Sequence, residues 1–160
     1  AHATTFVVVS RETREHIDRI GLADRGWWTD AWWRDAVASG HAAVASHSWD
    51  HNHDLAAHLM GRPRATGTFR TIDRYDLAED EIARASAHLK RVAPNPGDRL
   101  FAYPYGDTDP SIQHLIGACG YNVGVTCQSR LSVLSDTPLA LPRIEVSGFD
   151  SLPEFIAKLG

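Results

Sequence analysis

The amino-acid sequence predicts an α/β fold built on a mostly parallel sheet or barrel. Two observations support this prediction. Short apolar runs of β-forming residues alternate with longer amphipathic segments, and no tight turn of the hairpin type joins two neighbouring strand candidates. Strands that alternate with helices and lack hairpins are connected by crossovers, which place helices against the faces of a parallel sheet.

The strand candidates are short apolar runs, several of them rich in β-branched residues. The first is residues 5–9, and the second is the small-residue run 42–45, which leads directly into a group of histidines. Three more candidates follow, at residues 100–103, 121–126 and 139–146.

The helix candidates are marked by apolar stripes and by capping residues. Residues 77–92 show the most regular stripe, which consists of Ile82, Ala85, Leu89 and Val92. The other helices are expected from signals at their ends: residues 12–20 before Gly21, a helix between Thr29 and Gly40, a helix opened by Asp109 and Pro110, and a last helix capped by Ser151 and Glu154. Residues 61–73, with Gly, Pro and Thr, are expected to form a loop.

Size and composition fit a single domain, residues 1–160, since domains usually contain about 100–150 residues. The 16 basic and 20 acidic residues give a net charge of −4 without any Lys/Arg run, which argues against a nucleic-acid partner. No apolar run approaches the roughly 20 residues of a membrane-spanning helix. Cys119 and Cys127 leave both a disulfide and two thiols open.

A group of histidines directly follows the second strand candidate. His47 and His51 are four residues apart, which places two imidazoles on one face of a helical turn and suits a divalent metal. In parallel α/β folds, functional groups collect where the strands end. The alternative interpretation is structural histidines, and the flanking Ser48 and Asp50 do not decide between the two.

Two further features lie at later strand candidates. The turn Tyr103-Pro104-Tyr105-Gly106 can present the backbone N–H of Tyr105 or Gly106 to a developing oxyanion, although such residues are also ordinary turn formers. Arg143 is a lone charge in an apolar run. It fits a partner of a buried carboxylate or a charge on an edge strand.

Aromatic and histidine residues in the helix candidates have less specific patterns. A group of tryptophans is compatible with a sugar-stacking platform or with the core, and consists of Trp27, Trp28, Trp32 and Trp33. His88 and His114 fall in amphipathic helices, where we expect them to be solvated.

In combination and in this order, these features resemble the polysaccharide deacetylases of the NodB-homology group, carbohydrate esterase family four. The similarity extends from Ala3 to Val146. Its segments are Ala3-Thr4-Thr5-Phe6-Val7-Val8 for the family's second strand, His47-Ser48-Trp49-Asp50-His51 for its metal motif, Phe101-Ala102-Tyr103-Pro104-Tyr105-Gly106 for its third motif, and Leu141-Pro142-Arg143 for its late strand motif.

This resemblance implies a deformed (β/α) barrel and a metal-dependent hydrolase. The expected reaction removes N-acetyl groups from a polysaccharide that contains N-acetylglucosamine, and it releases acetate. The implied cofactor is a divalent metal, Zn²⁺, held by two histidines and an aspartate, of which His47 and His51 are the histidines here. Tyr105, through its backbone N–H, and Arg143 are the implied catalytic residues. The implied substrate-binding residues are Tyr103, Pro104 and Gly106.

One departure from the family concerns its first motif, Thr-Phe-Asp-Asp-Gly, which supplies the aspartate base and the third metal ligand. The sequence does not contain this motif. We therefore expect an incomplete barrel that lacks its first strand, with an N-terminal segment or a second chain completing it. A non-catalytic carbohydrate-binding relative and a hydrolase of a small amide are the alternatives. A polysaccharide substrate implies a secreted, periplasmic or cell-surface protein, while the sequence leaves a cytoplasmic location open.

Overall fold

A computed structural model describes residues 2–19, 29–49, 75–106 and 108–159, and the statements that follow concern these residues. Helices and strands alternate as the sequence predicts. In chain order the elements are β1 (Ala3–Val7), α1 (Arg11–Arg19), α2 (Asp30–Ala38), β2 (Ala42–Ser46), α4 (Tyr75–Val92), η3 (Pro96–Arg99), β3 (Leu100–Ala102), η4 (Pro104–Gly106), α5 (Pro110–Ala118), β4 (Val123–Val125), η5 (Pro138–Ala140) and α6 (Leu152–Lys158).

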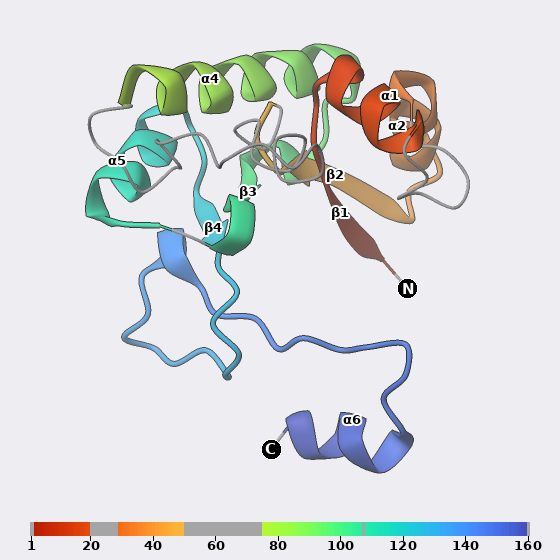
Figure 1. Cartoon of the computed structure of the whole chain (residues 1–160), viewed down its shortest axis with the longest axis vertical. Helices are drawn as coiled ribbons and strands as arrows, with labels where there is room; N and C mark the ends of the chain where they lie inside the picture. Colours follow the sequence, from red (N-terminus) through yellow and green to blue (C-terminus); the bar gives the residue numbers. More distant parts are fainter. Residues whose placement is uncertain (1, 20–28, 50–74, 107, 160) are drawn as a thin grey trace.

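The four strands form one parallel sheet in the order β1-β2-β3-β4 (Figure 1). β1 and β2 pair along their whole length, from Ala3 opposite Ala42 to Val7 opposite Ser46. β2 and β3 meet only where Ser46 lies opposite Phe101. Because all four strands run in the same direction, their C-terminal ends lie along one edge of the sheet. The predicted α/β class with a parallel sheet is confirmed.

The sheet is open within the described residues, and β1 forms one of its two edges. The N–H of Ala3 donates to His41 on the β2 side, and the carbonyl of Val7 accepts from His47 on that side too. Backbone groups alternate along a strand, so those of Thr4 and Phe6 point to the other side. An open sheet with β1 at its edge is the arrangement that an incomplete barrel requires.

Two groups of buried side chains form the core, and α4 contributes to both. The predicted stripe of α4 is buried as expected, with none of its four residues more than 7% exposed. One group joins α2 and α4 to β1 and β2 and consists of Val7, Val9, Trp33, Val44, Ala85, Leu89, Val92 and Ala93. The other joins β3 to α4 and α5 and consists of Ile82, Phe101, Tyr103, Ile112, Leu115, Ile116 and Tyr121.

Capping residues begin three of the helices where the sequence predicts them. The Thr29 side chain accepts from the N–H of Trp32, and Asp109 accepts from Ile112. Ser151 and Glu154 form a reciprocal capping box at α6. These side chains satisfy backbone N–H groups that the first helical turn leaves without a partner.

The prediction of a fifth strand over residues 139–146 is wrong. Residues 138–140 form the turn η5, and only Leu141 makes a β-bridge, parallel to Val125. Pro142 follows directly and has no N–H to donate, so it interrupts a strand at this point. The N–H of Arg143 instead donates to Gln128.

The C-terminal part of the chain, residues 127–159, contributes little to the core. In Figure 1 α6 lies apart from the sheet and from the helices that cover it. No residue of α6 is buried, and Phe149, just before it, is fully exposed. Among the helices described, none has the length and apolar character needed to cross a membrane.

Candidate active site at the strand ends

His47 directly follows β2, as the sequence predicts, and lies at the C-terminal edge of the sheet. Its backbone N–H donates to Val7 at the end of β1. Its ring Nδ1 lies 2.8 Å from the carbonyl oxygen of Ala102, the last residue of β3. A carbonyl only accepts, so Nδ1 carries the proton and Nε2 carries the lone pair of a neutral imidazole. The imidazole therefore has its orientation fixed by the two neighbouring strands.

The electrostatic surroundings of His47 favour this neutral form. Burial lowers the pKa of His47, the bond to the Ala102 carbonyl acts in the opposite direction, and the positive charge of Arg143 lowers it further. A neutral imidazole whose second nitrogen donates to a backbone carbonyl is the usual state of a metal-ligating histidine.

The residue after His47 has an unusual backbone conformation. Ser48 is buried and has a positive φ of 69°, in the left-handed region that residues other than glycine seldom adopt. Its carbonyl accepts from the N–H of Val9, two residues before α1 begins. Such strain persists only where the surrounding structure enforces it, and it is concentrated at functional sites.

The turn at the end of β3 contains the second predicted feature. Tyr103 and Pro104 are buried beneath it, and the Tyr103 hydroxyl donates to the Leu139 carbonyl at 2.6 Å. Tyr105 is exposed and has φ 58°, and Gly106 has φ 72°. The N–H of Gly106 donates to the carbonyl of Tyr103 at 2.9 Å and closes the turn. The resemblance assigns the role of oxyanion donor to the other residue of the turn, Tyr105.

Gly106 also lies against the backbone that follows β4. A Cβ at this position would lie 2.6 Å from the Cβ of Cys127, which is closer than such atoms approach in folded proteins. The turn and the segment after β4 are thus in direct contact, and only glycine fits between them.

Arg143 reaches this edge of the sheet from the C-terminal part of the chain. Its Nε donates to the Thr126 carbonyl at 2.8 Å, and its Nη2 lies 3.6 Å from Sγ of Cys127. Its Cζ lies 6.0 Å from the centre of the Phe6 ring. A hollow of about 320 Å³ opens beside it, lined by Cys127, Arg143, Ile144 and Glu145. The described contacts of the guanidinium are with a carbonyl, a thiol and a ring. Residue 143 lies in no strand, so the edge-strand alternative is wrong, whereas the buried-carboxylate alternative stays a prediction.

The structure thus brings His47, the Tyr105–Gly106 turn and Arg143 to one edge of the sheet. His51, the second predicted metal ligand, lies outside the described residues, as do Trp27 and Trp28. The roles of Tyr103, Pro104, Tyr105, Gly106 and Arg143 in catalysis or substrate binding stay predictions.

Both cysteines are free thiols. Of the other tryptophans, Trp33 is fully buried and belongs to the core, whereas Trp32 is half exposed.

The donor chemistry at His47 fits the divalent metal that the resemblance implies. The lone pair on Nε2, the neutral charge state and the bond from Nδ1 to a carbonyl are the properties of a zinc-binding imidazole. The described residues contain no group of three or more His, Cys, Asp or Glu side chains able to hold an ion. Among the described residues, the agreement with a divalent metal site is therefore established for the His47 imidazole alone.

The sequence analysis did not assign several nearby residues to this region. Thr126 and Cys127 follow β4 and are found by the same rule that located His47, namely that polar residues after parallel strands gather at one edge. His88 was expected to be solvated, and this expectation is wrong. Its side chain is only 17% exposed and contacts Asp30, a contact between residues 58 positions apart that no local pattern signals.

Comparison with known families identifies the class of protein. The sequence model of the family described as Polysaccharide deacetylase matches residues 1–124, more than three quarters of the chain. The chain belongs to this polysaccharide deacetylase family. The matched range includes His47 and the Tyr105–Gly106 turn and ends before Arg143. None of the curated proteins compared with the chain matches it.

Solved structures of deacetylases share the fold. The Streptococcus pyogenes deacetylase PplD, in complex with acetate, has a TM-score of 0.72 and 16% identity, over 100% of this chain and 59% of that one. IcaB from Ammonifex degensii has a TM-score of 0.67 and 24% identity, over 98% of this chain and 71% of that one. A polysaccharide deacetylase from Bacillus cereus has a TM-score of 0.67 and 18% identity, over 99% and 42%. The chain therefore spans less than two thirds of the S. pyogenes and B. cereus structures.

Proposed function

We propose that this domain removes N-acetyl groups from a polysaccharide that contains N-acetylglucosamine, in a metal-dependent hydrolysis. Water attacks the amide carbonyl, the C–N bond breaks, and acetate and a free amine are released. The observation on which this rests is the meeting of His47, the Tyr105–Gly106 turn and Arg143 at one sheet edge. Membership of the deacetylase family supports it, as does the acetate in the S. pyogenes deacetylase, because acetate is the product of this reaction.

In this proposal His47 and His51 hold a divalent cation, Zn²⁺. A cation at this position would supply a Lewis acid for the carbonyl and a nucleophile at neutral pH. The orientation of His47 supports this role, because the bond to Ala102 places the proton on Nδ1 and the lone pair on Nε2. Burial also keeps the imidazole neutral, so protons compete less with the ion.

The Tyr105 backbone N–H stabilises the oxyanion that develops on the carbonyl. A donor fixed in advance costs no reorganisation during the reaction. The left-handed conformation at Tyr105 and the closed turn at Gly106 provide such a fixed position, supported by the buried Tyr103 and Pro104. Arg143 contributes positive charge next to His47, where negative charge develops in the reaction.

The general base and a third metal ligand are assigned to a segment or chain beyond these 160 residues. In this proposal it pairs with the open side of β1 and brings its carboxylates to the C-terminal edge of the sheet. General-base help is worth about 10²–10⁴ in rate. We therefore expect the 160-residue chain to release acetate slowly from N-acetylglucosamine oligomers. A polysaccharide substrate accords with a secreted, periplasmic or cell-surface location.

The test of this proposal is zinc titration of the 160-residue chain by isothermal calorimetry. We expect measurable zinc binding that His47→Ala abolishes, because that variant removes a ligand. His41→Ala is the matched control, since His41 is exposed at the opposite end of β2, and we expect it to bind zinc like the unchanged chain.

The outcomes separate the candidate functions. Zinc binding that is insensitive to His47→Ala would contradict the metal centre. Binding of chitin oligomers without any zinc binding would instead favour the non-catalytic carbohydrate-binding relative. Zinc-dependent acetate release at a high rate by the 160-residue chain would show that its own residues contain the base, and Asp50 would be the first to substitute.

A further inference from the structure

The segment after His47 is held from two sides through Trp49. The N–H of Trp49 donates to the carbonyl of Glu81 on α4 at 3.1 Å. The carbonyl of Trp49 accepts from the N–H of Ser10, just before α1, at 2.5 Å. Trp49 is therefore a fixed point two residues after His47, between α4 and the end of β1.

The indole of Trp49 is clamped by two side chains of α4. The ring of His88 meets it edge-on, with 5.7 Å between ring centres and an angle of 75°. The guanidinium of Arg84 lies over its face, 4.0 Å from the ring centre. Contacts of both kinds are attractive and depend on geometry, so the position of the indole is coupled to that of His88.

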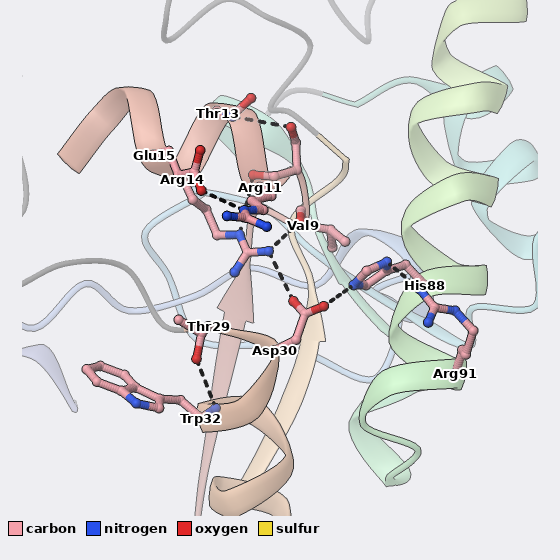
Figure 2. A network of polar contacts seen from close by, with 11 residues as sticks. Val9, Arg11, Thr13, Arg14, Glu15, Thr29, Asp30, Trp32, His88 and Arg91 are labelled. Atoms are coloured by element: carbon pink, nitrogen blue, oxygen red, sulfur yellow. Dashed lines mark hydrogen bonds and ion pairs between the residues drawn. The ribbon is translucent and has the colours of Figure 1, made fainter. Parts of the chain in front are cut away.

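His88 is in turn fixed by a chain of polar contacts between three helices (Figure 2). Arg91 only donates, so its Nη2, 3.2 Å from Nδ1, makes that nitrogen an acceptor. The proton is therefore on Nε2, which donates to Asp30 of α2 at 3.1 Å. Asp30 accepts at its other oxygen from the buried Arg14 of α1, which also donates to the Val9 carbonyl.

We propose that His88 is a positioning residue for the metal centre, acting through Trp49. Through its ring it fixes the indole and therefore the backbone that carries His47. Its polar contacts with Asp30 and Arg91 hold the ring but do not themselves reach the site. This inference rests on the proposed function, since it assumes that His47 binds a metal ion.

Two variants separate the ring from the polar contacts. His88→Gln keeps an N–H that can reach Asp30 but removes the ring beside Trp49. His88→Phe keeps a ring beside Trp49 but removes the donor to Asp30. We expect His88→Gln to weaken zinc binding about 10- to 100-fold, the usual effect of losing a residue that orients a ligand. His88→Phe should bind zinc within a few-fold of the unchanged chain, while its midpoint of thermal unfolding falls further than that of His88→Gln.

The control is His114→Gln on the exposed face of α5, which should change neither quantity. Hydrogen exchange without metal provides a second readout, in which the Trp49 amide exchanges faster in His88→Gln than in His88→Phe. Zinc affinities that follow overall stability across the variants would overturn the inference, and so would unchanged affinity in His88→Gln. If the unchanged chain bound no zinc, the proposed function and this inference would both be overturned.

Discussion

Two regions of the chain use their apolar residues in opposite ways. In the sheet region, residues 2–126, large side chains such as Trp33, Ile82 and Phe101 are completely buried. In the C-terminal region, residues 127–159, Leu134 and Phe149 are completely exposed. Yet α6 has a full capping box, which is a stronger local signal than the single cap of α2. Local signals thus mark where a helix begins, whereas burial of its side chains requires a complementary surface.

One part of the C-terminal region does join the sheet region. Leu141 donates to Gly124 at 2.8 Å and accepts from Thr126 at 2.9 Å, and Arg143 donates to Gln128. These bonds carry Arg143 to the candidate site. The family match ends at residue 124, so Arg143 lies outside the matched range and is positioned by this attachment to the end of β4 and the residues after it.

The largest expected difference between the regions is the loss of unfolding free energy when one phenylalanine in each is replaced by alanine. Phe101→Ala removes a ring that lies between Tyr103 and Tyr121, with ring centres 5.3 and 5.2 Å away. We expect this variant to lose about 3–5 kcal/mol of unfolding free energy. Phe149→Ala is the matched control, and we expect a change within about 0.5 kcal/mol, because the side chain is fully exposed. Urea unfolding followed by circular dichroism measures both.

A loss in Phe149→Ala comparable with that in Phe101→Ala would contradict this contrast. It would mean that the exposed side chains of the C-terminal region are buried in solution, for example against a second copy.

A smaller effect is expected from glycine substitutions. Gly106→Ala forces a methyl group against Cys127 and places alanine at φ 72°. The left-handed conformation alone costs about 1–2 kcal/mol, and the contact adds to it, so we expect a loss of about 2–3 kcal/mol. Gly148→Ala, where a Cβ meets nothing within 4 Å, is the control, and we expect no loss there. Thermal unfolding of both variants checks this, and equal midpoints would contradict the close contact at Gly106.

The sequence was sufficient to predict most of the fold, because its signals are local and periodic. The stripe of α4, the caps of three helices and the parallel arrangement required only the residues in each segment. The strand expected over residues 139–146 failed because an apolar run does not reveal its partner, and Pro142 limits pairing to a single bridge.

The candidate site was predictable only in part, for a related reason. His47, Tyr105 and Arg143 were selected as candidates because they stand in recognisable segments at or near strand ends. The bond from His47 to Ala102 and the contact of His88 with Asp30 join residues 55 and 58 positions apart. The positive φ of Ser48 could not be predicted either, because a serine in the sequence does not indicate a left-handed backbone conformation. Such features follow from the packing of the whole domain.

The smallest expected effect concerns one of the hydrogen bonds that join the two regions. The Tyr103 hydroxyl, at the end of β3, donates to Leu139 in η5. Tyr103→Phe keeps the buried ring and removes this bond, and we expect a loss of about 1 kcal/mol at pH 7. Urea unfolding at a series of pH values measures the difference between the variant and the unchanged chain.

The pH dependence of that difference distinguishes a buried hydroxyl from an exposed one. Burial raises the pKa of Tyr103 to about 12, whereas an unfolded tyrosine ionises near pH 10, at about its ordinary pKa. As the pH rises through this interval, the Tyr103 hydroxyl ionises in the unfolded state before it does so in the folded state, which lowers the unfolding free energy of the unchanged chain. Tyr103→Phe has no hydroxyl at this position, so its unfolding free energy does not fall for this reason. Tyr121, whose pKa burial also raises to about 12, is present in both proteins, so its effect cancels. The advantage of the unchanged chain should therefore shrink from pH 10 upward. A constant difference up to pH 12 would mean that the hydroxyl reaches solvent and that η5 is not fixed to the sheet through Tyr103.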